Sequence, residues 1–218
     1  MNKVLVVAAH PDDEVLGCGA TIAKHTQDKD KVRVIFLSDG FTSRNRSSDR
    51  ESSAENALEV LGCGRPIFLN FPDNRLDTVP LLEVVKELEK SIDEFQPNIV
   101  YTHHFGDLNI DHQLTHRAVM TACRPQPNFC VKEIYSFEVL SSTYWQSISM
   151  GNSFNPNYFV DISKFMSKKV EAIQCYDLEM RQYPHARSIE MVKNLAKYRG
   201  GLAGLLAAEA FCVERLAK

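Results

Sequence analysis

The sequence predicts an α/β protein: a Rossmann-like, doubly wound and mostly parallel sheet in a single domain with an irregular C-terminal half. Three observations support this prediction. Short runs rich in Val, Ile and Leu alternate with helix-like stretches through the first half of the chain. The first run, Lys3 to Ala9, is apolar at nearly every position, as expected for a strand covered on both faces. Clusters of ionisable residues follow two of the runs, at the sheet edge where doubly wound proteins place their sites.

Four strands and four helices are expected along the first half. The expected strands are residues 3–9, 32–37, 66–69 and 98–102. The expected helices are residues 15–27, 51–61, 80–95 and 111–123, with Gly62 ending the second. Because parallel strands are joined by right-handed crossovers, the loops at the carboxyl ends of the strands should carry the functional groups.

The pattern becomes less regular after Pro125. Residues 133–139 and 158–161 resemble strands, and residues 163–176 and 188–206 resemble helices. The chain shows no internal repeat, low-complexity tract or linker. With 218 residues, 44% of them hydrophobic, it is long enough to bury one core, so residues 1–218 are predicted to form a single domain.

Composition excludes several classes of function. The 25 basic and 28 acidic residues leave a net charge of −3, so there is no bulk positive charge for nucleic acid or anionic lipid. No apolar run approaches the roughly 20 residues of a membrane span, and the run from Val4 to Ala9 is too short for a signal peptide, which predicts a cytoplasmic protein. Six cysteines without a CxxC pair indicate reduced thiols rather than disulfides or a thiolate zinc site. A homo-oligomer is compatible with this composition.

The segment His10-Pro-Asp-Asp-Glu14 stands directly after the first expected strand. Taken alone, Pro-Asp-Asp-Glu is typical of an ordinary helix start, because Pro suits the first turn and carboxylates complement the helix dipole. His10 changes this interpretation, since an imidazole and a carboxylate three residues apart can converge on one divalent cation. His10 and Asp13 are therefore candidate metal ligands. Asp12 would stand beside the metal as a general base that accepts a proton from water.

The loop after the fourth expected strand, residues 102–112, holds three histidines and two aspartates. The first and fourth strands are neighbours in the common doubly wound order, so both clusters should face one crevice. His112 is the expected third ligand, because it stands at a helix start as the first cluster does; His103 and His104 are its rivals. Two imidazoles and one carboxylate leave a coordination position open, which favours a hydrolytic Zn²⁺ site, with Fe²⁺ as the alternative metal. Asp111 should either orient a site histidine or cap the helix.

These motifs carry a family resemblance. Ala9-His-Pro-Asp-Asp-Glu14 after a hydrophobic strand, with a later Asp111-His112 at a helix start, closely resembles the LmbE-like (PIG-L) family of metal-dependent de-N-acetylases. Other stretches extend the resemblance over nearly the whole chain: Asp39-Gly40, Leu61-Gly62, Phe71-Pro-Asp73, His185-Ala-Arg-Ser188, Arg199-Gly200 and Ala208-Glu-Ala-Phe211.

The resemblance implies that His10, Asp13 and His112 bind zinc and that Asp12 is the general base. It also implies that the substrate is an N-acetylated amino sugar or its conjugate. Many members carry a histidine three positions before the second zinc-binding histidine, where it stabilises the oxyanion, whereas this chain has Asn109. Asn109 can still donate a hydrogen bond there, so it is kept as a catalytic candidate beside Asp12 and Asp111.

An amide cannot serve as a general acid, so the proton for the leaving amine would have to come from His103, His104 or His185. These three histidines and Arg187 are also candidate substrate contacts. Residues 185–188 equally suit a plain helix entry with exposed side chains.

Three arginines follow the second expected strand in a polar segment: Arg44, Arg46 and Arg50. Their guanidinium groups suit sugar hydroxyls or a phosphate if the segment folds over the crevice. A solvated loop is the alternative.

Two other classes of protein compete with a hydrolase. A catalytically silent protein would use the same crevice to bind a sugar or nucleotide sugar, with Asn109 as the inactivating change, although retention of Asp12 argues against it. A dinucleotide enzyme needs a glycine-rich turn where this chain has a carboxylate cluster, which would repel pyrophosphate. The expected partner is therefore a small-molecule or glycoconjugate substrate, and release of acetate separates the hydrolase from the binding protein.

Overall fold

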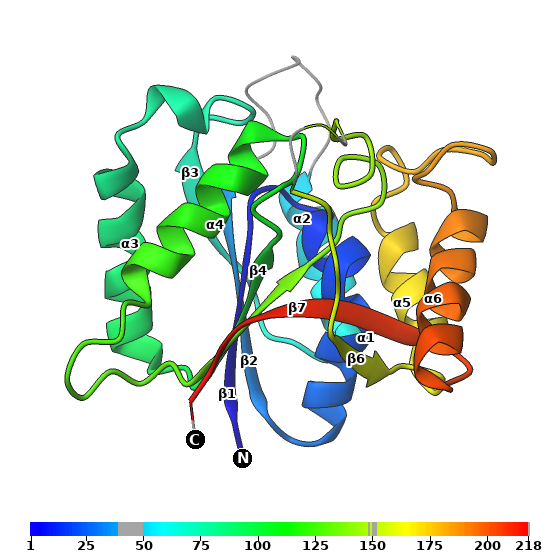
Figure 1. Cartoon of the computed structure of the whole chain (residues 1–218), viewed down its shortest axis with the longest axis horizontal. Helices are drawn as coiled ribbons and strands as arrows, with labels where there is room; N and C mark the ends of the chain where they lie inside the picture. The colour runs from blue at the N-terminus through cyan, green and yellow to red at the C-terminus, as the bar shows by residue number, and fades with distance from the viewer. Residues whose placement is uncertain (39–49, 148, 150–151, 218) are drawn as a thin grey trace.

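The computed structural model describes residues 1–38, 50–147, 149 and 152–217. Within these residues one sheet has seven strands. They are β1 (Lys3–Ala8), β2 (Lys31–Ser38), β3 (Ile67–Phe71), β4 (Ile99–His103), β5 (Glu133–Phe137), β6 (Tyr158–Asp161) and β7 (Ala208–Leu216). Their order across the sheet is β3-β2-β1-β4-β5-β7-β6, with β7 antiparallel to both neighbours and every other adjacent pair parallel (Figure 1). This arrangement confirms the predicted Rossmann-like, mostly parallel α/β fold.

Strand β1 is the centre of the parallel part of the sheet. Val6 lies opposite Val34 of β2 on one side and opposite Tyr101 of β4 on the other. The prediction that the first and fourth strands are neighbours is therefore confirmed. Because both strands are parallel, the segments that follow them emerge at the same edge of the sheet, and the two ligand-rich clusters meet there.

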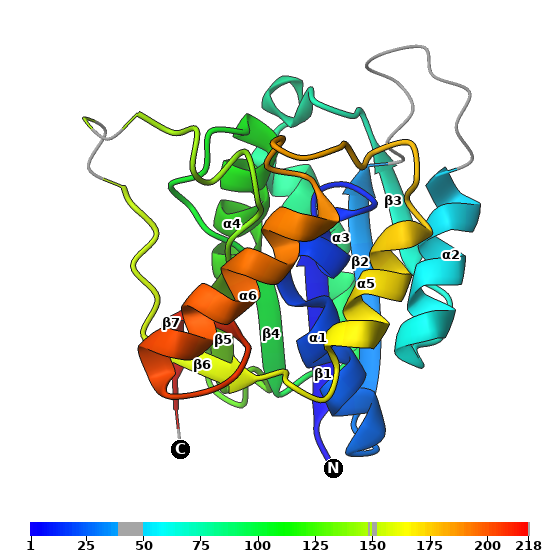
Figure 2. The same cartoon turned by 90° about the vertical axis from the view of Figure 1, so that its right-hand side faces the viewer.

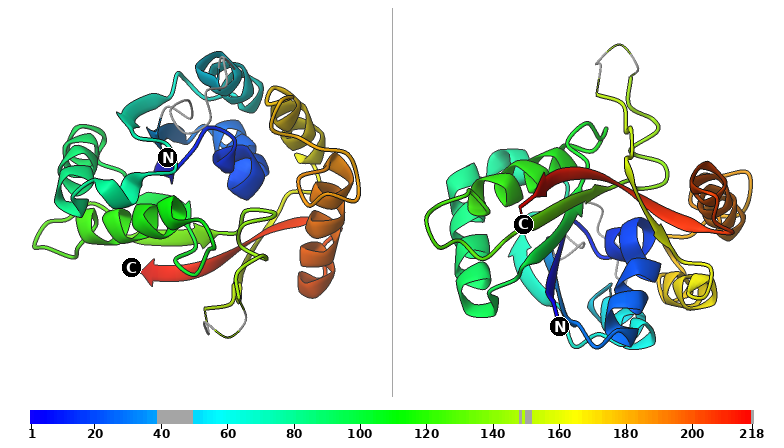
Figure 3. Two further views of the ribbon diagram at one scale, coloured as in Figure 1. Left: turned by 90° about the horizontal axis from the view of Figure 1, so that it is seen from above. Right: turned by 60° about the horizontal axis from the view of Figure 1, so that its bottom comes forward.

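Six α-helices and one short 3₁₀ helix cover the sheet in the described part of the chain. They are α1 (Asp13–Gln27), α2 (Arg50–Leu61), η1 (Leu76–Thr78), α3 (Leu81–Phe95), α4 (Ile110–Ala122), α5 (Met166–Gln174) and α6 (Ile189–Ala203). Helices α1, α2, α5 and α6 pack on one face and α3 and α4 on the other (Figure 2 and Figure 3). No helix among the described residues is both long and apolar enough to span a bilayer.

The two cores follow from the alternation of side chains along β1. Val4, Val6 and Ala8 contribute to the core under α1, and Leu5 and Val7 contribute to the core under α3 and α4. All five side chains are fully buried. Full burial of a Val or Leu side chain contributes about 1.5–3 kcal/mol, so apolar residues on both faces of β1 stabilise the fold.

The first-half elements lie where the sequence predicts them, with ends that differ by at most two residues. The C-terminal half differs more. The predicted helix 188–206 ends earlier, at Ala203, where Gly204 takes the left-handed conformation with φ 71° and terminates it. Strand β7 was not predicted, because Leu205 and Leu206 continue the apolar spacing of the helix before it. Its position between β5 and β6 depends on tertiary contacts and not on local sequence.

Helix α1 is broken at Cys18, whose φ of −141° and ψ of 22° are not helical. Glu209 of β7 accepts two backbone N–H groups of the turn after the break, at 3.0 and 2.7 Å. Lys169 of α5 donates to the carbonyl of Leu16 at 2.8 Å and to Glu209 at 2.5 Å. Both charged side chains are buried, so this ion pair holds the first turns of α1, which carry the first predicted cluster.

Candidate metal centre and active site

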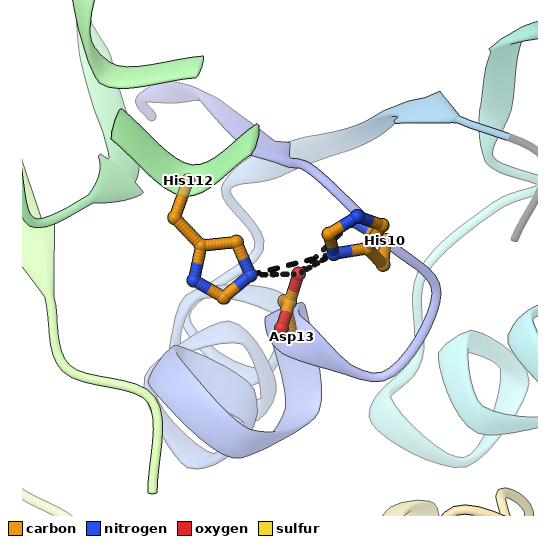
Figure 4. Close-up of side chains that lie close together, drawn as sticks. All are labelled: His10, Asp13 and His112. Atoms are coloured by element: carbon orange, nitrogen blue, oxygen red, sulfur yellow. Dashed lines mark hydrogen bonds and ion pairs between the residues drawn. The ribbon is translucent and has the colours of Figure 1, made fainter. Parts of the chain in front are cut away.

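Three predicted ligands converge at the carboxyl edge of the sheet. His10 follows β1, Asp13 is the first residue of α1, and His112 lies in the first turn of α4, which follows β4. Figure 4 shows the two imidazoles and the carboxylate pointing toward one another. All three residues are buried. The adjacency of β1 and β4 is what brings them together.

The distances among these three side chains suit one tetrahedral metal ion. The Nδ1 atom of His10 and the Nε2 atom of His112 are 3.3 Å apart, and each lies 3.2 Å from Oδ2 of Asp13. Bonds of about 2.0–2.1 Å to a tetrahedral ion place the ligand atoms about 3.3–3.4 Å apart. The other oxygen of Asp13, Oδ1, is buried and has no hydrogen-bond partner among the described residues. The donor set and its spacing therefore fit a divalent cation.

A carboxylate contacts the remaining nitrogen of each candidate ligand histidine. Nε2 of His10 is 3.1 Å from Asp111 Oδ2 and 3.3 Å from Asp73 Oδ1. Nδ1 of His112 is 3.2 Å from Asp107 Oδ1. Such carboxylates accept the N–H of a metal-binding imidazole and set the direction of its other nitrogen. Asp111 thus lies where one of its two predicted roles, the orientation of a site histidine, would place it.

Sequence reasoning missed Asp73 and Asp107. Asp73 follows β3 at the same sheet edge, and Asp107 lies in the histidine-rich loop, so their positions after strands were the available signal. A second group with metal-ligand spacing, His10 with Asp73 and Asp111, shares the imidazole of His10. The N–H of that imidazole explains the closeness of these two carboxylates.

The charges of the cluster favour a bound cation. Burial lowers the pKa of His10, but hydrogen bonds to Asp111 and Asp13 outweigh it and raise the pKa to about 10. Burial likewise lowers the pKa of His112, while the charge of Asp13 and the contact with Asp107 raise it to about 9. Burial alone would raise the pKa of Asp13, yet the neighbouring histidines hold it well below its ordinary value. A dense group of buried carboxylates thus requires positive charge among them.

Asp12 lies beside the ligands in an uncommon backbone conformation. Its φ is 120°, a region that costs a non-glycine residue energy and that recurs at functional sites. The carboxylate of Glu14 accepts the N–H of Asp12 at 3.1 Å, and Nη1 of Arg187 donates to Asp12 Oδ2 at 2.6 Å. Burial raises the pKa of Asp12 to about 6, although the charge of Arg187 opposes the shift. A carboxylate at this place can exchange a proton near neutral pH.

Two predicted substrate contacts are buried behind the site. His103 has no exposed surface, its ring stacks on His112 at 3.9 Å, and its Nε2 accepts the N–H of Ala9. Burial holds the pKa of His103 well below its ordinary value, so it is neutral. His104 is also buried, with Nε2 3.0 Å from the carbonyl oxygen of Asn152. Both side chains are thus enclosed by protein, and their predicted contact with a substrate stays a prediction.

Asn109 is the N-cap of α4. Its Oδ1 accepts the N–H of Asp111 at 2.9 Å, and its Nδ2 donates to Asn74 Oδ1 at 3.2 Å. The cap position foreseen for Asp111 thus belongs to Asn109. Both polar atoms of the Asn109 side chain thus have a hydrogen-bond partner, and its predicted oxyanion contact stays a prediction.

Two further predicted contacts, Arg50 and Arg187, act on Asp12. Arg50 forms an ion pair with Glu179 at 2.5 Å, and its charge acts on Asp12. Arg187 contacts Asp12 directly. His185 is exposed, and its ring meets the ring of the half-exposed Trp145 edge to face at 5.8 Å. Arg44, Arg46 and the Asp39-Gly40 pair lie outside the described residues.

Fold and site together define a Rossmann-like α/β protein with a candidate metal centre of two histidines and one aspartate at the switch point of its sheet. The chain belongs to the PIG-L family, described as GlcNAc-PI de-N-acetylase, whose model matches residues 5–123. This is a family of deacetylases.

Three known proteins illustrate the relationship. An uncharacterised deacetylase, YaiS of Escherichia coli K12, is 32% identical over 78% of this chain and 88% of its own length. The diacetylchitobiose deacetylase of Thermococcus kodakarensis is 28% identical over 96% of this chain and 82% of its own length. The crystal structure of GalB, a 4-carboxy-2-hydroxymuconate hydratase from Pseudomonas putida KT2440, superposes with a TM-score of 0.79 at 23% identity, covering 100% of this chain and 99% of that one. The last similarity concerns the fold alone, because one fold can support different reactions.

Proposed function

We propose that the protein is a metal-dependent hydrolase that removes the N-acetyl group from an N-acetylated amino sugar or its conjugate. Membership of a de-N-acetylase family supports the reaction, and a relative named for diacetylchitobiose supports the substrate class. The observation that carries the proposal is the set of 3.2–3.3 Å separations among His10, Asp13 and His112, with Asp12 next to them. We also propose that residues 1–218 form a single domain, which carries this activity.

His10, Asp13 and His112 would hold the metal, which we propose is Zn²⁺, with Fe²⁺ as the alternative. A metal bound there lowers the pKa of water and polarises the acetamide carbonyl. The six free cysteines, all outside this donor set, support a reducing compartment such as the cytoplasm.

Asp12 accepts the proton that water loses as its oxygen attacks the acetamide carbon. When the bond between carbon and nitrogen breaks, the proton on Asp12 passes to the leaving amine. The balanced products are acetate and a free amino sugar. Backbone groups engage Nε2 of His103 and Nε2 of His104, so we assign the acid step to Asp12 as well, with the exposed His185 as the alternative proton donor.

Arg50 and Arg187, whose charges act on Asp12, and the exposed His185 would contact the sugar or its attached group. Guanidinium groups donate several hydrogen bonds in a fixed plane, which suits vicinal hydroxyls or a phosphate.

The test is acetate release from a panel of N-acetylhexosamine conjugates by protein loaded with Zn²⁺ or Fe²⁺. Asp12→Asn should lower kcat by a factor of about 10² to 10⁴, because it removes the proton acceptor. Asp93→Asn, at an exposed position on α3, is the matched control and should keep wild-type activity. Tight binding of a conjugate without acetate release would instead support the catalytically silent sugar-binding protein.

A further inference from the structure

A hydrogen-bonded chain runs from Asp12 to a strained turn in the second half of the sequence. Nη1 of Arg187 donates to Asp12 Oδ2 at 2.6 Å, and Nε of the same guanidinium donates to Oγ of Ser141 at 3.3 Å. Asp12 and Ser141 are both buried. Because a guanidinium group is planar, two contacts on different nitrogens fix its orientation. Ser141 therefore helps to determine where Arg187 holds the carboxylate of Asp12.

The backbone of Ser141 is strained. Its φ is 86°, in the region that glycine adopts freely and that costs other residues energy. The turn that contains it is closed by the carbonyl of Ser141, which accepts the N–H groups of Tyr144 at 3.1 Å and Trp145 at 3.0 Å. A glycine at this position would relieve the strain, but it would have no hydroxyl for Arg187. Serine at this position therefore strains the backbone, but its hydroxyl provides the contact with Arg187.

The same turn also contacts the other half of the site. Thr143 Oγ1 donates to Asp107 Oδ2 at 2.6 Å, and Ser142 Oγ donates to the same oxygen at 3.1 Å. Asp107 Oδ1 lies 3.2 Å from Nδ1 of His112. Residues 141–143 therefore touch the partner of the candidate general base and the partner of a candidate metal ligand.

An ion pair anchors this turn to helix α6. Arg199 donates from Nε to Glu138 Oε1 at 2.9 Å and from Nη2 to Glu138 Oε2 at 2.6 Å, and both residues are buried. The hydroxyl of Tyr144 contacts both Glu138 and Arg199. Two parallel charge-assisted hydrogen bonds are strong and directional. Contacts within the protein interior thus hold the turn in place.

We propose that residues 141–143 form a positioning turn for hydrolysis: Ser141 aligns Asp12 through Arg187, and Thr143 aligns His112 through Asp107. The inference rests on the proposed function for its effect on rate. We call the contacts from Ser141 through Arg187 to Asp12 the Ser141 arm, and those from Thr143 through Asp107 to His112 the Thr143 arm. Substitutions in the two arms should affect different quantities. The Ser141 arm acts on kcat, since it touches no candidate metal ligand, and the Thr143 arm acts on metal affinity.

The decisive variant is Ser141→Gly. It should lower kcat about tenfold or more at nearly unchanged metal affinity and with a smaller effect on KM, because small displacements of a reacting group cost large factors in rate. Its resistance to urea should stay equal or increase, because glycine relieves the strained φ. A merely structural serine would move stability and activity in the same direction. A kcat within twofold of wild type, or a rise in KM alone, would overturn the Ser141 arm.

Two substitutions examine the partners of the turn. Arg187→Lys keeps the charge near Asp12 but cannot bridge two groups with one rigid plane, so its kcat should lie between those of Arg187→Met and wild type. Thr143→Val should lower Zn²⁺ affinity about tenfold, and Thr143→Ser, which keeps the hydroxyl, should restore it. Unchanged Zn²⁺ affinity in folded Thr143→Val would overturn the second arm.

One measurement is independent of catalysis. In a double-mutant cycle on the free energy of unfolding, Arg187→Met and Ser141→Gly should be non-additive, whereas Arg187→Met and Asp93→Asn should add. If the wild type releases acetate from no conjugate, the proposed function fails while this cycle and the metal affinities still test the turn. Additive effects of Arg187→Met and Ser141→Gly would show that the contact does not exist in solution.

Discussion

His10 and His112 are 102 positions apart in the sequence, yet their Nδ1 and Nε2 atoms lie 3.3 Å apart across the carboxylate of Asp13. Two buried imidazole nitrogens at this distance repel each other unless a proton or a metal ion lies between or beside them. The parallel pairing of β1 with β4 creates this relationship, because each strand delivers one histidine to the same edge of the sheet.

Metal binding should stabilise the fold. At a free Zn²⁺ concentration 100 times the dissociation constant, the stabilisation is about 2.7 kcal/mol, which for a chain of this size raises Tm by roughly 5–10 °C. Thermal unfolding with and without Zn²⁺ measures the shift. His112→Ala should abolish it, and His185→Ala, which changes an exposed residue outside the candidate ligand set, should retain it. An unchanged shift in His112→Ala would contradict the proposed centre.

The carboxylates behind the histidines should tune the affinity for metal. Asp107→Asn and Asp111→Asn each replace an acceptor of an imidazole N–H, so each should weaken metal binding by a factor of about 10–100. Competition with a chromophoric chelator measures the affinity. Asp93→Asn is the matched control, because Asp93 is exposed on α3. Equal affinities in all three variants would show that the contacts do not orient the ligands.

Two glycines in α1 should respond oppositely to alanine. A Cβ on Gly17 would overlap the ring of Phe137 in β5, whereas a Cβ on Gly19 would meet Val15 at an ordinary 3.6 Å. Gly17→Ala should therefore lower the free energy of unfolding by about 1–3 kcal/mol. Gly19→Ala should leave it unchanged or raise it by up to about 1 kcal/mol, because alanine favours the helix. Urea unfolding of both variants checks the pair, and equal losses would refute the close approach of α1 to β5.

The stability of the protein should depend on pH through Asp30. Burial raises the pKa of Asp30, but hydrogen bonds from Asn2 and His25 outweigh it and hold the pKa below its ordinary value. The unfolded chain, with a pKa of about 3.9, therefore takes up the proton first. The contribution of Asp30 is fully present above that pH and is lost as pH falls through the lower folded pKa.

Asp30→Asn should accordingly cost about 1–2 kcal/mol at pH 6 and less at pH 3. Urea unfolding at the two pH values measures the difference between wild type and variant. Asp177→Asn, at an exposed position, is the control and should show no such pH dependence. A cost that stays the same at pH 3 would show that the contacts do not depend on the charge of Asp30.

The placement of the candidate ligands could be predicted because each lies within a short local motif. His10, Asp12 and Asp13 occur in one turn after a strand, and His112 occurs at the start of a helix after another strand. The common order of doubly wound sheets then predicts their proximity. Arg187 could be named as a candidate but not placed on Asp12, because 175 positions separate the two residues and no periodicity links them.

The local sequence could not predict that Asn109 caps α4 or that His103 and His104 are buried. A histidine-rich loop offers several nitrogens, and only packing decides which of them face the site. The N-cap of α4 took the Asn109 side chain, and the stacking of His103 on His112 placed it in the interior. Whether a polar side chain such as Asn109 caps a helix or faces the site depends on the groups that surround it in the folded protein.

By itself, the sequence determined the alternation of apolar strands and amphipathic helices, the parallel sheet that this alternation requires, and the two motifs that follow β1 and β4. These features depend on residues close together in the chain. Only the tertiary structure decided the insertion of β7, the carboxylates that orient the histidines, and the contact of Arg187 with Asp12 and Ser141. The physical reason is that burial and charge pairing are properties of neighbours in space, and folding chooses those neighbours from distant parts of the chain.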